Sequence, residues 1–297
     1  MTHLPICRQR RYNPSASMSR AAVAVGAVCL MAATATPVAQ QAAPAFEVAR
    51  IKPRTGERPL TVGAVSPDRF YRPDITLKAL VQFAYDLWDF QVDGGPEWVR
   101  SDRWSIEAKA TGPQRPAAMR LMVRRLLAER FGLQTHLESR ELPTYELLMA
   151  RRDGRLGPNL KAATVDCRPF LTGERPRDES PREDASGFPR CSTGGRSVAG
   201  AFTPRLNGQP ISALARLLEP IVRRRVIDRT GLQGIFDVEL TVSLEVAGLT
   251  SPPPGAQINE APSVFTALQE QLGLRLEAAR GPVDVLVIDL AVQPTPD

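Results

Sequence analysis

Alternating apolar and polar residues predict three short strands along this chain. The alternation occurs in 46–51, 104–109 and 236–240, is strict in 104–109, and is typical of strands with one buried and one solvated face. Pro53 ends the first of these segments and Gly94-Gly95-Pro96 precedes the second, so each segment is a separate element.

Apolar residues at a spacing of three and four predict amphipathic helices between the strands. The first helix covers 77–87, and either Asp74 or Thr76 can cap the free amides of its first turn. The second begins near Pro116, because proline suits a first helical turn, and Gly132 ends it in a left-handed conformation. The residues of this second helix expected to face the core are Met119, Met122, Val123, Leu126 and Leu127.

The same order of elements recurs in the second half of the chain, which predicts an internal duplication. A helix from Ser212, a short strand at 226–227 and a helix capped by Ser263 repeat the elements of the first half. The clearest match is between 128–133 and 269–274, since in both segments a helix ends in Gly-Leu.

Further strands are predicted after each Gly-Leu stop. In the first half they occupy 133–138 and 145–150, with Pro143 between them because proline cannot donate to a strand ladder. In the second half the last strand covers 283–288. The predicted fold is therefore α+β, with two repeated lobes that each pack two helices on a small mixed β-sheet.

The predicted organisation has a leader at 1–39, a first lobe at 46–150, a linker or insertion at 151–195 and a second lobe at 196–292. Part of the insertion, 174–190, is rich in proline, serine and charged residues and is predicted to be disordered.

The leader has the pattern of an export signal. A basic start is followed by an apolar run at 21–33 and by the small-x-small cleavage pattern Ala33-Thr34-Ala35. The run covers about 20 Å of a hydrocarbon core that is ~30 Å thick, which favours a cleaved signal over a stable membrane anchor. Met1 and Met18 both remain candidate starts, and Arg10-Arg11 leaves a twin-arginine route open. We therefore predict a periplasmic or extracellular protein.

The net charge of +6 comes mainly from this leader. Without its first 39 residues the chain has 34 basic and 32 acidic residues, a net charge of +2. A nucleic-acid partner is therefore not predicted.

Two cysteines, Cys167 and Cys191, remain after the predicted cleavage. An even pair in an exported protein predicts a disulfide, which would stabilise the fold by about 3 kcal/mol. With His136 as the one remaining histidine, the chain lacks the ligands of a structural zinc site, and no metal is predicted.

Six ordered motifs carry a resemblance that spans nearly the whole chain after the leader. The chain resembles a large family of exported proteins of unknown function that is expanded in soil bacteria. No motif of that family has an established catalytic role, so the resemblance implies no site residue. The motifs are Phe46-Glu47-Val48-Ala49-x-Ile51-Lys52-Pro53, Gly95-Pro96-x-Trp98, Ser101-Asp102-Arg103, Arg130-Phe131-Gly132-Leu133, Val226-Ile227-Asp228-x-Thr230-Gly231-Leu232 and Phe265-Thr266-Ala267-Leu268-Gln269-Glu270-Gln271-Leu272-Gly273-Leu274.

The element order is also similar to the short amino-terminal domain of secretins and TonB-dependent receptors. That domain binds protein partners and has no active site, so this more distant resemblance implies a binding role.

Candidate catalytic groups are each better explained by structure. His136 is expected on the surface, since no nucleophile-elbow motif accompanies it. Asp228 is expected to bond the amides of its own turn, where Gly231 supplies the positive φ. Glu107 and Glu239 would serve a carboxylate hydrolase only if they converged, and they fall in different repeats. No catalytic, cofactor-binding or metal residue is therefore predicted.

Aromatic residues are concentrated in one region that contains all three tryptophans. Core packing explains most of them, but part of the group follows the first helix in a loop that also contains aspartates. The predicted binding surface comprises Trp88, Phe90, Trp98 and Trp104.

Two function classes remain open. The absence of a nucleophile motif, a metal cluster and a cofactor loop favours a non-catalytic binding or signalling module, with an envelope protein, a peptide or a cell-wall fragment as partner. The alternative is an extracytoplasmic hydrolase with an unorthodox carboxylate site.

Overall fold

The computed structural model describes residues 44–54, 65–175, 179, 191, 194–198, 201–243 and 261–295. The predicted export leader at 1–39 lies outside the described residues, as does most of the stretch 174–190 that was predicted to be disordered.

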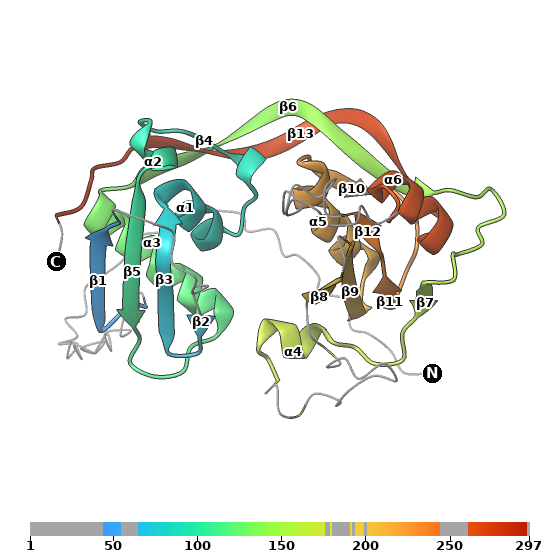
Figure 1. Cartoon of the computed structure of the whole chain (residues 1–297), viewed down its shortest axis with the longest axis horizontal. Helices are drawn as coiled ribbons and strands as arrows, with labels where there is room; N and C mark the ends of the chain where they lie inside the picture. Colours follow the sequence, from blue (N-terminus) through green and yellow to red (C-terminus); the bar gives the residue numbers. More distant parts are fainter. Residues whose placement is uncertain are drawn as a thin grey trace, which may run out of the picture. The chain divides into compact units, whose positions relative to one another are not determined.

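The first half of the chain contains an antiparallel sheet in the order β1-β5-β3-β2 (Figure 1). Its strands are β1 (Val48–Pro53), β2 (Val65–Ser66), β3 (Arg69–Thr76) and β5 (Arg103–Lys109). The helices of this half are α1 (Leu77–Tyr85), the short α2 (Trp98–Ser101) and α3 (Pro116–Phe131), with a 3₁₀ turn η1 (Asp89–Gln91).

Local signals in the sequence set the ends of these helices. The hydroxyl of Thr76 accepts a hydrogen bond from Ala79 N at 3.2 Å, so Thr76 rather than Asp74 caps α1. Pro116 occupies the first turn of α3, and Gly132 ends that helix at φ 54°. The predicted starts of both helices and the glycine stop are confirmed.

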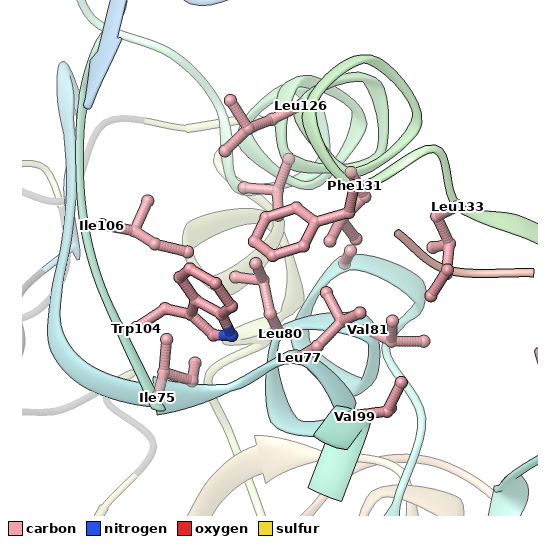
Figure 2. Packing of buried hydrophobic residues seen from close by; sticks show 14 of the residues in the cluster. Ile75, Leu77, Leu80, Val81, Val99, Trp104, Ile106, Leu126, Phe131 and Leu133 are labelled. Carbon is pink, nitrogen blue, oxygen red and sulfur yellow. The ribbon is translucent and has the colours of Figure 1, made fainter. Parts of the chain in front are cut away.

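A continuous core lies between this sheet and its helices (Figure 2). Leu77 and Leu80 of α1 and Ile106 of β5 have no exposed surface. Trp104 of β5 points into the same cluster and meets the ring of Phe131 edge-on, with ring centroids 5.6 Å apart. All five core positions predicted on α3 are buried.

The second half contains another antiparallel sheet, in the order β12-β9-β11-β7, with β8 also paired to β9. Its strands are β7 (Leu160–Ala162), β8 (Gly194–Val198), β9 (Ala201–Gln209), β11 (Phe236–Glu239) and β12 (Val242–Ser243). The helices of this half are α4 (Arg168–Thr172), α5 (Ile211–Val222) and α6 (Val264–Ala267), which continues into a π-helical turn η3 (Leu268–Leu272). Ser263 caps α6 through its hydroxyl, as predicted.

A third sheet joins both halves of the chain. Its order is β10-β6-β13-β4, and the central pair is antiparallel while each outer strand is parallel to its neighbour. The outer strands are short, β4 (Val92–Gly94) and β10 (Val226–Asp228), whereas β6 (Gln134–Met149) and β13 (Leu274–Leu290) are long and run side by side (Figure 1).

The predicted break at Pro143 is wrong, because β6 is one strand of 16 residues. The amide of Tyr145 donates to Arg225 O at the outer edge of β6, and Pro143, two residues earlier, faces the same edge. β10 does not extend to that position, so the missing N–H of Pro143 removes no ladder bond. Pro282 is accommodated in the same way within β13, which is also one strand.

The second half of each long strand, β6 and β13, packs in the core of the other half of the chain, so the two halves exchange strand ends. The second half of β6 contributes Leu147 to the core of the second half of the chain. The second half of β13 contributes Leu286 and Ile288 to the first core, together with Ala291 just beyond it. The predicted ranges 46–150 and 196–292 therefore each contain one strand end that packs in the other core.

The fold is α+β, as predicted. In both halves a strand, a helix, a short strand of the third sheet, a second strand and a helix ending in Gly-Leu follow one another. This correspondence supports an internal duplication, which nevertheless stays a prediction.

Candidate functional site

The four aromatic residues of the predicted binding surface do not form one exposed patch in the structure. Trp104 has only 4% of its surface exposed and lies inside the first core, so the prediction is wrong for this residue. The alternation that placed Trp104 on a strand is correct, but its side chain is on the buried face of β5. Trp98 is half-buried and packs edge-on against Trp104, with centroids 6.4 Å apart.

Trp88 is half-buried and makes a hydrogen bond to the second half of the chain. Its indole N–H donates to Oε2 of Glu219 at 2.7 Å. Glu219 on α5 is fully buried, and its other oxygen accepts from Arg225 at 2.7 Å and from the amide of Val226 at 3.2 Å. A buried carboxylate requires such partners, so Trp88 has a structural role here. The sequence offers no signal for this contact, because Glu219 lies within an apolar helix.

Asp86, close to Trp88 in the chain, makes a second contact between the two halves of the chain. It ends α1 at φ 58°, and its carboxylate pairs with Arg120 of α3 and with Arg216 of α5, each at 2.7 Å. Arg216 also lies over the Trp88 ring, at 5.7 Å from the ring centroid. Phe90, the fourth predicted surface residue, is half-buried. A binding role for Trp88, Phe90 and Trp98 stays a prediction.

A cavity of about 590 Å³ lies between α1, the start of α3 and α4. Its volume is in the range of small-molecule sites, about 300–1,000 Å³. Most of its walls are apolar, and the polar part is dominated by arginines. The lining residues are Ser66, Pro67, Phe83, Pro113, Gln114, Arg115, Pro116, Met119, Arg120, Phe170, Leu171, Gly173 and Arg175.

The disulfide positions one wall of this cavity. Cys167 and Cys191 are bonded, as predicted, with an S–S distance of 2.01 Å. They form a small buried cluster with Phe170 of α4, which follows Cys167 by three residues. Gly173 ends α4 at φ 75°, and an added Cβ there would be in ordinary van der Waals contact with the ring of Pro116, at 3.5 Å. The disulfide thus fixes the start of α4 to Cys191, while Gly173 at the end of the helix lies next to Pro116 at the start of α3.

The rim of the cavity is basic. Among the described residues, its lining contains three arginines and no aspartate or glutamate. Arg120 pairs with Asp86, and Arg175 pairs with Glu179 at 3.1 Å, whereas Arg115 is exposed and has no ion-pair partner among the described residues. The guanidinium of Arg115 is therefore available to an anionic group of a ligand. Sequence reasoning missed this site because its walls come from segments that are distant in the chain.

The two candidate carboxylates do not share a site in the structure. Glu107 lies on β5 in the first sheet, and Glu239 lies on β11 in the second. Glu239 is paired with Arg205 at 2.8 Å. The arrangement gives no cleft with two opposed carboxyl groups.

His136 is exposed, as expected, and has a partner that the sequence did not indicate. Its Nδ1 lies 2.8 Å from Oδ1 of Asp289. Antiparallel pairing of β6 with β13 places the two side chains close together. Among the described residues no hydroxyl group hydrogen-bonds to this imidazole, so the pair lacks the nucleophile of a catalytic triad.

Asp228 and Gly231 have the structural roles that their turn predicts. The carboxylate of Asp228 accepts from the amide of Thr230 at 3.0 Å and from its hydroxyl at 2.8 Å. Gly231 follows with a φ of 74°. This geometry is that of an Asx turn.

Within the described part of the chain, no group of three or more histidine, cysteine or acidic residues could hold a metal ion. No helix in that part is long and apolar enough to cross a membrane.

These features define a small α+β domain with a disulfide-supported, arginine-rimmed cavity. The chain belongs to the family described as Protein of unknown function (DUF3738), whose model matches residues 78–291. No curated protein and no solved structure shows a significant match to the chain.

Proposed function

We propose that this chain is an exported, non-catalytic binding module, and that its ligand occupies the cavity between α1, α3 and α4. The mostly apolar cavity of about 590 Å³ with arginines at its rim carries this proposal. Among the partners expected from the sequence, an envelope protein, a peptide or a cell-wall fragment, it favours a group with an apolar body and an anionic end.

Export is part of the proposal. It is supported by the leader pattern at 1–39 and by the disulfide between Cys167 and Cys191, which forms and persists in oxidising compartments. The resemblances to a soil-expanded exported family and to the short domain of secretins and TonB-dependent receptors support the same role.

The hydrolase alternative has no comparable support. Its two candidate carboxylates, Glu107 and Glu239, lie in different sheets, and Glu239 is already engaged by Arg205.

Fluorescence titration with two small probes tests the cavity. Anilinonaphthalene sulfonate is apolar and anionic, and phenylnaphthylamine has a similar apolar body without the charge. We expect Arg115→Glu to weaken binding of the anionic probe about fivefold or more, because an attractive charge becomes repulsive, and to leave the neutral probe unaffected. Leu171→Glu, in the apolar wall, should weaken both probes.

The matched control is Arg152→Glu, which makes the same charge change at an exposed position outside the cavity lining. The melting temperature of each variant is recorded, since unfolded protein also binds these dyes. Equal binding of both probes to wild type, Arg115→Glu and Leu171→Glu would show that the cavity is not a ligand site.

A further inference from the structure

The outer edge of β6 is open over the half of the strand that follows α3. Among the described residues, β10 pairs with this edge at Tyr145, Glu146 and Leu147 alone. Backbone groups of alternate residues face it, as the bonds from Arg225 O to Tyr145 N and from Arg229 N to Leu147 O show. The same alternation places the N–H and C=O groups of Thr135, Leu137 and Ser139 on this edge. Among the described residues no strand pairs with them.

Prolines at the neighbouring positions of β6 and β13 lack an N–H group, and they limit the length of the unpaired edge. Pro143 removes the outward N–H between the open stretch and β10, and Pro282 does the same on the outer edge of β13. The carbonyl of Glu141 is engaged by the guanidinium of Arg280 at 2.9 Å. The unpaired edge therefore runs from Thr135 to the amide of Glu141, long enough for a short added strand.

An exposed apolar side chain and a cavity lie along the open stretch. Leu137 has 67% of its surface exposed, the highest fraction among the exposed large apolar side chains of the described residues. It lines a cavity of about 650 Å³ with Leu87, Val283 and Leu286. A strand added beside β6 would direct every second side chain to the face that carries Leu137.

The charged side chains that line this cavity indicate which charge the ligand carries. Among the described residues that line it, Arg124 and Arg225 stand against Asp284 as the one carboxylate. Arg225 is paired with Glu219, but Arg124 stacks on Tyr85 at 4.4 Å and has no carboxylate partner among the described residues. The cavity therefore complements an acidic side chain.

We propose that the edge of β6 from Thr135 to Glu141 binds an extended peptide segment of a partner protein, which adds as a strand and places an apolar and an acidic side chain in the cavity beside Leu137 and Arg124. Main-chain hydrogen bonds supply affinity in such strand addition, and the alternate side chains supply specificity. The added strand continues the line along which β10 already pairs with β6. This surface is separate from the cavity at α4, which shares none of its lining residues.

Ser139→Pro is a direct test, because it removes one outward N–H without breaking a bond to β13, as Pro143 does naturally. A displayed library of random eight-residue peptides is selected on the full chain, and enriched peptides are measured by fluorescence anisotropy. We expect enrichment of apolar and acidic residues at alternating positions, and a loss of affinity of about tenfold or more on Ser139→Pro. Ser139→Ala, which keeps the N–H, is the matched control and should bind like wild type.

Peptides with every second amide N-methylated give an independent readout that needs no protein variant, and they should not bind. The proposal is overturned if no peptide is enriched. It is also overturned if the enriched peptides bind Ser139→Pro as tightly as wild type and if their N-methylated forms bind wild type as tightly as the unmethylated peptides. A dimer of the chain that Ser139→Pro dissociates, seen by light scattering, would instead assign the edge to a second copy.

Discussion

At the residue scale, Gly94 is one of the positions where a positive φ and a close backbone approach coincide. Its φ is 75°, and an added Cβ would lie 2.7 Å from the carbonyl oxygen of Ile288 in β13. Gly231 has a φ of 74° with no atom within 4 Å of the same position. The two glycines thus have nearly the same φ and differ in the space available for an added Cβ atom.

We expect Gly231→Ala to lower the free energy of unfolding by about 1–2 kcal/mol, the cost of a left-handed non-glycine residue. Gly94→Ala should lower it further, because a backbone carbonyl cannot move away from the new methyl group without disturbing the pairing of β4 with β13. Urea denaturation of both variants measures the difference. Equal destabilisation by the two substitutions would contradict the close approach.

At the element scale, Arg140 of β6 connects strands on both sides of β13. It donates to Asp93 on β4 at 2.8 Å and to Glu138 at 2.7 Å. Hydrogen bonds from Arg140 are the main reason why the pKa of Asp93 and the pKa of Glu138 lie below their ordinary values. A lowered pKa in the folded state stabilises the protein at pH values above the ordinary pKa, and this contribution is lost as the pH falls through the folded pKa.

Arg140→Gln should therefore raise the pKa of both carboxyl groups toward their ordinary values and reduce the loss of stability on acidification. Carbon-detected NMR titration of the carboxyl groups measures both pKa values. Asp153 serves as an internal control, since a hydrogen bond from Arg151 lowers its pKa to about 2 independently of Arg140. Unchanged pKa values for Asp93 and Glu138 in the variant would show that Arg140 does not connect these strands in solution.

At the scale of the whole molecule, the exchanged strand ends make the two halves dependent on each other. The first core takes Leu286, Ile288 and Ala291 from the carboxyl-terminal part of the chain, and β6 pairs along its length with β13. A fragment of residues 44–150 would lack these side chains and leave β6 unpaired.

We expect this fragment to show no cooperative thermal unfolding, because three buried side chains of its core and the partner of its longest strand are missing. Circular dichroism during heating and the dispersion of amide NMR signals measure the outcome, with the full chain as control. A fragment that melts as cooperatively as the full chain would show that the exchanged ends are dispensable.

The local elements could be predicted from the sequence because their signals lie within a few residues. Thr76 and Ser263 as caps, Pro116 as a helix start and Gly132 as a stop act on their own turn of backbone. The pairing of Cys167 with Cys191 followed from the number of cysteines after the predicted leader.

Only the tertiary structure decided how these elements combine. Pro143 was predicted to divide two strands, but an edge without a partner tolerates proline, and no local pattern shows which edge is unpaired. Trp104 and Trp88 were predicted on one binding surface, yet one lies in the core and the other bonds to Glu219, 131 residues away. The sequence by itself thus determined the α+β class, the helix ends marked by caps and glycine stops, and the disulfide, since these depend on neighbours in the chain or on the cysteine count. The joining sheet, the exchange of strand ends and both cavities depend on contacts between distant segments, which only the folded chain brings together.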